Sequence, residues 1–94
     1  YSGSIDYFEA ASLAGQAGYY AVQEDFEKAA SLFLQASKIS KINSQNPDYL
    51  LNAGIYYLKA GEKEEAKILF DRIKEDYSTS LAYREVDKYL AMIY

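Results

Sequence analysis

Residues 49–70, YLLNAGIYYLKAGEKEEAKILF, contain the pattern of a helix, a turn and a second helix. Apolar side chains recur every three or four residues on both sides of Gly61, which is the spacing of an amphipathic helix. The glutamates that follow Gly61 favour a helix start, because acidic side chains stabilise the positive end of a helix dipole. This stretch therefore predicts two helices joined by a short turn.

The same pattern occurs 37 residues earlier in the chain. Matching residues at a fixed offset indicate stacked structural repeats. The pairs that match at this offset include Leu13 and Leu50, Tyr19 and Tyr56, Tyr20 and Tyr57, Glu27 and Glu64, Ala29 and Ala66, and Phe33 and Phe70. The sequence thus predicts two copies of one helical hairpin.

Helices are expected throughout, since Pro, Gly and β-branched residues are too sparse for several strands and turns. The predicted helices cover about 5–23, 25–42, 47–60, 62–77 and 80–94, with Asn46 as the N-cap before Pro47. Gly15 and Gly18 each cost the first helix about 0.5–1 kcal/mol, which indicates a close helix contact there. The predicted buried stripes are Phe8, Ala11, Leu13, Ala14, Ala17, Tyr20 and Ala21; Phe26, Ala29, Ala30, Leu32, Phe33, Ala36 and Ile39; Ala66, Leu69, Phe70, Ile73 and Tyr77; and Ala82, Val86, Tyr89, Leu90 and Ile93.

Composition limits what the chain can do. Its 94 residues fit one domain, and half of them are apolar, as in a folded protein. The net charge of -4 and the scattered Lys and Arg residues disfavour nucleic acid and anionic membranes as partners. Because there is no Cys and no His, disulfides, zinc fingers and histidine-based catalysis are excluded. No apolar run approaches the ~20 residues of a membrane span.

The two copies resemble the tetratricopeptide repeat, which places small and aromatic residues at fixed positions of a helical hairpin. The residues that carry the resemblance are Leu13, Ala17, Tyr20, Ala29, Phe33 and Ala36, then Leu50, Ala53, Gly54, Tyr57, Ala66 and Phe70. The resemblance implies a single domain over 1–94, a fragment of a right-handed superhelix. Repeat 1 would span about 10–43, repeat 2 about 47–78, and a closing helix about 80–94.

The chain also departs from the family pattern. Gln16, Glu24, Ile73 and Ser78 replace residues that the repeat normally carries. The offset of 37 exceeds the family's ~34, so about three extra residues are expected between Ile39 and Asn46, in the helix or in its loop.

The second half has a closer resemblance. Residues 49–54 (YLLNAG), 65–67 (EAK) and 85–91 (EVDKYLA), together with Tyr77 and Ser80, are similar to bacterial envelope tetratricopeptide-like proteins. Those proteins are similar to the membrane-anchored, periplasmic ancillary subunit of the Sec translocon. The resemblance implies a location on the periplasmic side of a membrane. Since the sequence begins at Tyr1 without Met, we expect it to be a piece of a longer protein.

The family resemblance also implies a binding groove, lined by the first helix of each hairpin. The matching residues are Ala14, Gly18, Ala21, Asp48, Leu51, Asn52, Ile55 and Leu58. Such an apolar groove suits a helix or extended segment of a partner protein. Family members that clamp a terminal carboxylate use Lys, Arg and Asn, and here Asn52 alone fits. Two alternatives remain open: self-association through the same face, and a helical accessory domain with no ligand of its own.

Catalysis is not expected, and we predict no catalytic, cofactor or metal site. The carboxylate pairs Glu24/Asp25, Glu64/Glu65 and Glu75/Asp76 fall at predicted helix ends, where solvated caps are the simpler explanation. Serine nucleophiles would need a base, and the adjacent pairs Ser37-Lys38 and Ser40-Lys41 do not have the required spacing. Tyr49, Tyr56 and Tyr83 are left open between a contact surface and ordinary half-burial.

Overall fold

The computed structural model describes the backbone of residues 2–93 and the side chains of residues 5–93. Over that range the chain forms α1 (Ser2–Val22), α2 (Phe26–Lys38), α3 (Asn46–Lys59), α4 (Lys63–Asp76) and α5 (Leu81–Ile93). The predicted all-α fold class is therefore confirmed. Tyr94, the last residue of the fifth predicted helix, lies outside the described residues. None of the helices in the described range has the length and apolarity needed to cross a lipid bilayer.

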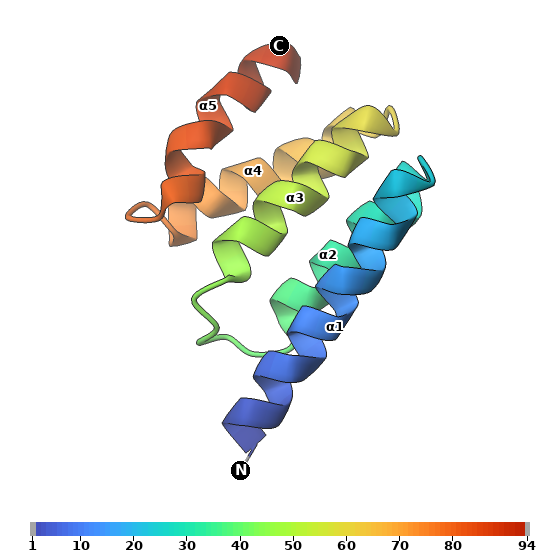
Figure 1. The fold of residues 1–94 in the computed structure, drawn as a ribbon. Helices are drawn as coiled ribbons and strands as arrows, with labels where there is room; N and C mark the ends of the chain where they lie inside the picture. Colours follow the sequence, from blue (N-terminus) through green and yellow to red (C-terminus); the bar gives the residue numbers. More distant parts are fainter. Residues whose placement is uncertain (1, 94) are drawn as a thin grey trace.

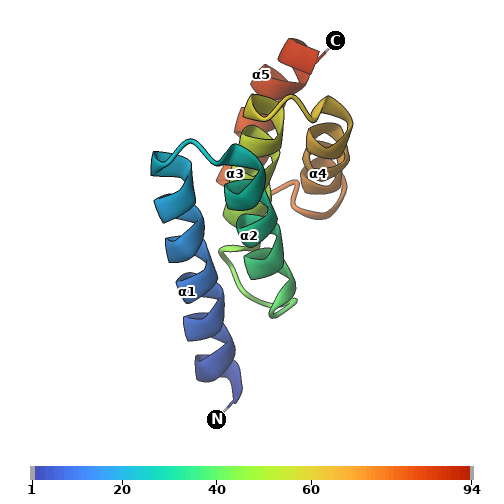
Figure 2. The same ribbon diagram turned by 90° about the vertical axis from the view of Figure 1, so that its right-hand side faces the viewer.

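The helices pack in chain order. α1 packs on α2, α2 on α3, α3 on α4, and α5 on both α4 and α3. Figure 1 shows the two termini at opposite ends of the molecule. In Figure 2, α1 lies on one side and α4 on the other, with α2 and α3 between them. The resulting body is flat, with principal extents of 44 × 32 × 17 Å.

The core follows the predicted stripes of the second, fourth and fifth helices. The fully buried side chains include Phe70 and Ile73 of α4 and Val86 of α5. Between α2 and α3 the Tyr56 ring is stacked against both Phe26 and Phe33, with ring centroids 5.9 and 5.8 Å apart. Phe26 and Phe33 are two helical turns apart on α2, so they bracket one ring of α3.

The two hairpin turns have the same backbone conformation at equivalent positions, 37 residues apart. Glu24 and Gly61 both have positive φ, 62° and 85°. After α1 the Asp25 N–H donates to the Tyr20 carbonyl at 2.9 Å, and after α3 the Glu62 N–H donates to the Tyr57 carbonyl at 2.8 Å. Both turns therefore end their helix with the same left-handed C-terminal motif, as expected from the sequence offset.

The predicted stripe of α1 is wrong at its N-terminal end. Phe8 is 71% exposed and Ala11 is exposed, whereas Ala10 is fully buried. Apolar residues occur on all sides of α1, so their spacing could not identify the side that α2 covers. A Cβ added at Gly15 or Gly18 would meet no atom within 4 Å, so the expected close helix contact is not made within the described chain.

The connection between α2 and α3 also differs from the prediction. α2 ends at Lys38 rather than near Ile42, so the residues between Ile39 and Asn46, where extra length was expected, form a loop. Asn46 is the first residue of α3 and not its N-cap, which is Gln45. The reason is that the Asn46 side chain is buried and donates to the Ser40 carbonyl, a residue six positions away. The Asn43 side chain instead accepts the backbone N–H of Gln45 at 2.9 Å.

Candidate functional site

The eight predicted groove residues lie on two helices that both pack on α2. Three of them are on α1 and five on α3. Seven are half-buried, and the eighth, Asp48, is exposed at the start of α3. We call this set the α1–α3 face; it consists of Ala14, Gly18, Ala21, Asp48, Leu51, Asn52, Ile55 and Leu58.

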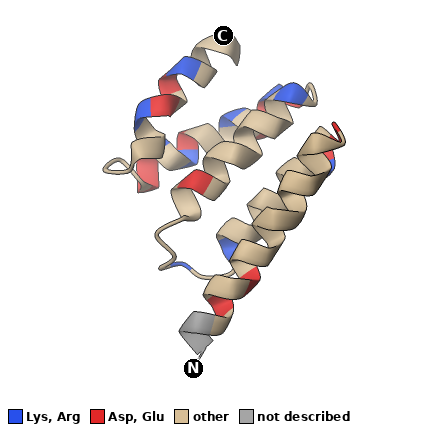
Figure 3. Ribbon diagram, in the orientation of Figure 1, with Lys and Arg blue, Asp and Glu red and all other residues tan. Residues whose placement is uncertain are grey.

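The α1–α3 face carries little charge. The described charged residues of α1 are Asp6 and Glu9, and those of α3 are Asp48 and Lys59, all towards helix ends. Figure 3 shows the middle of both helices free of charged residues, whereas charges of both signs cluster along α4 and α5. The face therefore presents small and apolar side chains between charged ends.

The aliphatic residues of this face also help to support the core. Leu51, Ile55 and Leu58 pack against the buried cluster while keeping part of their surface exposed. Gly18 differs, because nothing lies within 4 Å of the position its Cβ would occupy. Substitutions at Leu51 or Ile55 would thus disturb the fold, whereas Gly18 can be changed without a backbone clash.

The three tyrosines left open by the sequence are used in packing. Tyr49 is buried, with 9% of its surface exposed. Tyr56 is held between Phe26 and Phe33, as described above. Tyr83 is half-buried, and the Lys74 Nζ lies 5.3 Å from its ring centroid. Ordinary burial therefore accounts for these side chains.

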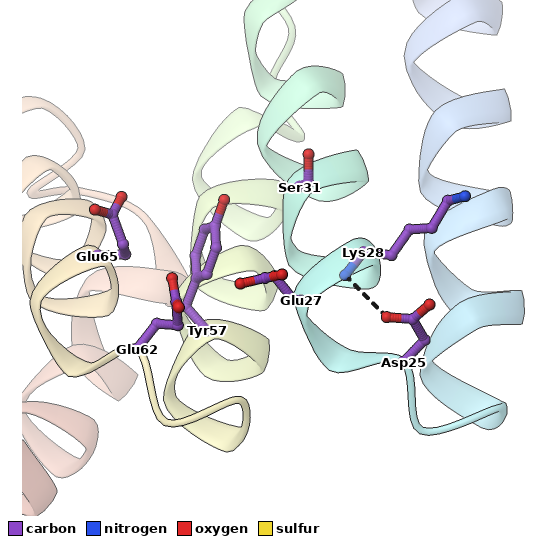
Figure 4. A pocket seen from close by; sticks show the side chains of 7 residues that line it. All are labelled: Asp25, Glu27, Lys28, Ser31, Tyr57, Glu62 and Glu65. Atoms are coloured by element: carbon purple, nitrogen blue, oxygen red, sulfur yellow. Dashed lines mark hydrogen bonds between the residues drawn. The ribbon is translucent and has the colours of Figure 1, made fainter.

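An acidic hollow of about 550 Å³ opens on another part of the surface, where α2 and α4 begin and α3 ends. Figure 4 shows Glu27 of α2 extending toward Tyr57 and Glu62, while Lys28 extends away from them toward α1. The Lys28 Nζ lies 4.5 Å from the centroid of the Tyr20 ring. The residues that line the hollow are Asp25, Glu27, Lys28, Ser31, Tyr57, Glu62 and Glu65.

The carboxylates of this acidic hollow act on one another. Repulsion from Glu27, with smaller contributions from burial and from Glu65, raises the pKa of Glu62 above its usual value. Burial, followed by the charges of Glu65, Glu62 and Glu27, raises the pKa of Tyr57. In both groups the surroundings make ionisation harder than in water. The hollow is a region of negative potential without a compensating Lys or Arg directed into it.

Helix capping explains this concentration of negative charge. Asp25 and Glu62 are the N-caps of α2 and α4, and Glu27 and Glu65 lie in the first turns of those helices. Acidic residues there stabilise the helix dipoles. Within the described residues, no group of three or more potential metal-ligating side chains has the arrangement that would hold a metal ion. The hollow therefore carries no chemistry that we can assign.

Sequence reasoning identified the members of this hollow only in part. Glu24/Asp25 and Glu64/Glu65 stood out as adjacent pairs, but the close approach of Glu27 and Glu62 joins different helices. The offset of 37 residues could have predicted that these acidic residues meet. Asp25 and Glu62 are equivalent at that offset, and neighbouring hairpins bring equivalent helix starts together.

Comparisons with known proteins do not add a relative. No family model, no curated protein and no solved structure matches the chain significantly.

Proposed function

We propose that this chain is a protein-interaction scaffold of the tetratricopeptide-like class, which binds a segment of a partner polypeptide on the α1–α3 face. The observation that carries the proposal is the composition of that face. Small and apolar side chains, half-exposed and nearly free of charge, run along two helices packed on the same neighbour. Apolar surface of this kind favours contact with another apolar surface over contact with water.

The repeated turn supports the assignment to a tandem-repeat class. Positive φ and the same backbone hydrogen bond recur at Glu24 and Gly61, 37 residues apart. In the proposed right-handed superhelix α1 and α2 form the first hairpin, α3 and α4 form the second, and α5 closes the end. The packing of α5 on both α3 and α4 fits that role. α1 and α3 contact each other weakly at most, so the two hairpins meet mainly through α2 and α3.

The chemistry of the face defines the expected partner. A helix or extended segment with apolar side chains fits it better than an anionic chain end, because Asn52 is the face's sole hydrogen-bonding amide and no Lys or Arg belongs to it. In this proposal the scaffold performs no catalysis and needs no cofactor. The resemblance of the second half to bacterial envelope proteins suggests a periplasmic location and a role in envelope protein handling.

Site-specific photo-crosslinking tests the proposal. A photoreactive residue is placed at Asp48 or Asn52 of the full-length protein in cells of the source organism. A matched probe at Ile68, which is 54% exposed on α4, serves as control. We expect the same partner polypeptides from both α3 positions and none of them from Ile68. Equal capture at all three positions, or no capture from α3, would refute the proposal.

A second candidate function is self-association, and a separate surface favours it. The outer side of α1 exposes Ile5, Phe8, Tyr19 and Val22 at 63, 71, 61 and 80%. This apolar strip could pack on a second copy of the chain. Sedimentation over a wide concentration range tests the candidate: a shift from monomer to dimer that Phe8→Asp abolishes supports it, and a monomer at every concentration removes it.

A further inference from the structure

A second hollow differs in charge from the rest of the molecule. It measures about 580 Å³ and lies where α2 ends, α3 begins and α4 ends. Its lining includes three basic side chains, Lys38, Lys41 and Arg72, and one acidic side chain, Asp76. The whole chain has a net charge of -4, so this local excess of positive charge runs against the overall balance. We call it the basic hollow.

The three cations of the basic hollow have no partners among the described residues. Among the described residues, ion pairs join Lys67 to Asp71, Lys74 to Asp87 and Lys88 to Glu85, and none of them involves the basic hollow. Lys38 lies in the last turn of α2, where the helix dipole already favours a cation. That explanation does not apply to Lys41, which is in the loop, or to Arg72, which lies before the last turn of α4.

Asn46 adds an unsatisfied polar atom to the lining of this hollow. The residue is 1% exposed and its Nδ2 donates to the Ser40 carbonyl at 2.5 Å. Its Oδ1 is buried and accepts no hydrogen bond. Buried acceptors are normally paired, and one left unpaired beside a hollow is a candidate contact for a ligand that carries a donor. The lining thus combines three unpaired cations with one free acceptor.

We infer that the basic hollow binds a phosphate-type oxyanion, one that keeps a proton at neutral pH. The charged oxygens would be held by Lys38, Lys41 and Arg72, with Arg72 able to contact two oxygens at once. The remaining P–OH group would donate to Asn46 Oδ1. Oδ1 is covered in the free protein, so this contact requires the side chains around Asn46 to rearrange. Sulfate, which has no proton at this pH, would leave the acceptor unpaired and therefore bind more weakly.

The test is a titration followed by two-dimensional nitrogen–proton NMR on the full chain at pH 7 and constant ionic strength. We expect inorganic phosphate to produce saturable shifts of the Lys41 amide and the Asn46 side-chain amide, and sulfate to bind at least about tenfold more weakly. Arg72→Gln and Lys41→Gln should each weaken phosphate binding about fivefold or more. The matched control Arg84→Gln, on exposed α5 surface, should leave it unchanged.

One further probe, phenyl phosphate, distinguishes the source of the phosphate. At about pH 5.5 inorganic phosphate and phenyl phosphate both keep a proton. Tighter binding of phenyl phosphate at that pH means that the site takes a phosphorylated molecule, and weaker binding means that it takes the free ion. Equal binding of phosphate and sulfate would overturn the role of Asn46 and with it the inference. No saturable shift, or shifts that Arg72→Gln leaves intact, would overturn the inference altogether.

Discussion

The two residues with left-handed backbone, Glu24 and Gly61, make the strongest internal comparison in this protein. They occupy equivalent positions of two equivalent turns, yet one is a glutamate and the other a glycine. A residue with a Cβ is strained at positive φ, whereas glycine is not. The first hairpin therefore carries a local strain that the second avoids.

We predict opposite effects on stability from placing glycine at position 24 and alanine at position 61. Glu24→Gly should raise the free energy of unfolding by up to about 1 kcal/mol, because it relieves the strain. Gly61→Ala should lower it by about 1 kcal/mol or more, because it introduces the same strain. Thermal unfolding measures both, and about 1 kcal/mol corresponds to roughly 4–8 °C for a domain of this size. Changes of the same sign would contradict the description of the turns.

Two other glycines, Gly54 and Gly15, give an independent prediction about packing. A Cβ on Gly54 would lie 2.5 Å from Phe70 Cε1, and Phe70 is fully buried and unable to move aside. Gly54→Ala should therefore destabilise by about 1–3 kcal/mol despite its better helix propensity. Gly15→Ala, with no atom within 4 Å, should stabilise by about 0.5–1 kcal/mol. Chemical denaturation of the two variants would refute the packing if both were stabilised.

Glu62 predicts a pH dependence with a definite sign. Repulsion from Glu27 raises its pKa in the folded state, so the folded protein binds the proton more tightly than the unfolded chain. The stability that this tighter proton binding adds is fully present below the ordinary glutamate pKa. It is lost as the pH rises through the raised pKa of the folded state. Glu62→Gln should therefore melt higher than the wild type at pH 7, and the difference should disappear near about pH 4. Melting curves across this range that run parallel would contradict it.

Among the elements, α2, α4 and α5 were predictable because one side of each is covered. Ala29, Phe33 and Ala36 keep their predicted burial, since a single buried stripe imposes helical spacing on the sequence. α1 was less predictable because it is apolar all round and packs mainly on α2 within the described chain. Its exposed Phe8 cannot be told from a buried one by spacing alone.

The loop between α2 and α3 shows what spacing cannot reveal. Asn46 has the composition of an N-cap, but its side chain is taken by the Ser40 carbonyl, and Gln45 becomes the cap. That bond joins residues six apart across a turn, and local preferences carry no information about it. The same limit applies to the acidic and basic hollows, each of which is assembled from three helices and the segments beside them.

α5 gives a prediction at the level of a whole element. Val86 is fully buried, and Tyr89 stacks on Phe70 with ring centroids 5.7 Å apart. Val86→Ala should lower the free energy of unfolding by about 1–3 kcal/mol through lost burial and a cavity. Met92→Ala on the same helix, 60% exposed, should change it by less than about 0.5 kcal/mol. Equal losses, measured by denaturant unfolding, would mean that α5 packs differently.

The molecule as a whole is a flat stack of helices. Its shortest extent is 17 Å, less than two helix diameters of about 10–12 Å. Such a body has little core for its surface. The residues of the α1–α3 face come from the family resemblance, which assigns them to the first helix of each hairpin, and their role in binding stays a prediction. The sequence could not predict that Leu51 and Ile55 also support the core, because that depends on how the hairpins are packed together.

The most direct test of the proposed binding face uses two glycines on one helix. Gly18 belongs to the α1–α3 face and Gly15 does not, and neither has an atom within 4 Å of its missing Cβ. Gly18→Glu and Gly15→Glu are each combined with the photo-crosslinker at Asn52, and capture of partner polypeptides is compared. We predict that Gly18→Glu abolishes capture while Gly15→Glu, equally folded by circular dichroism, retains it. Unchanged capture in both variants would show that the α1–α3 face is not where the partner binds.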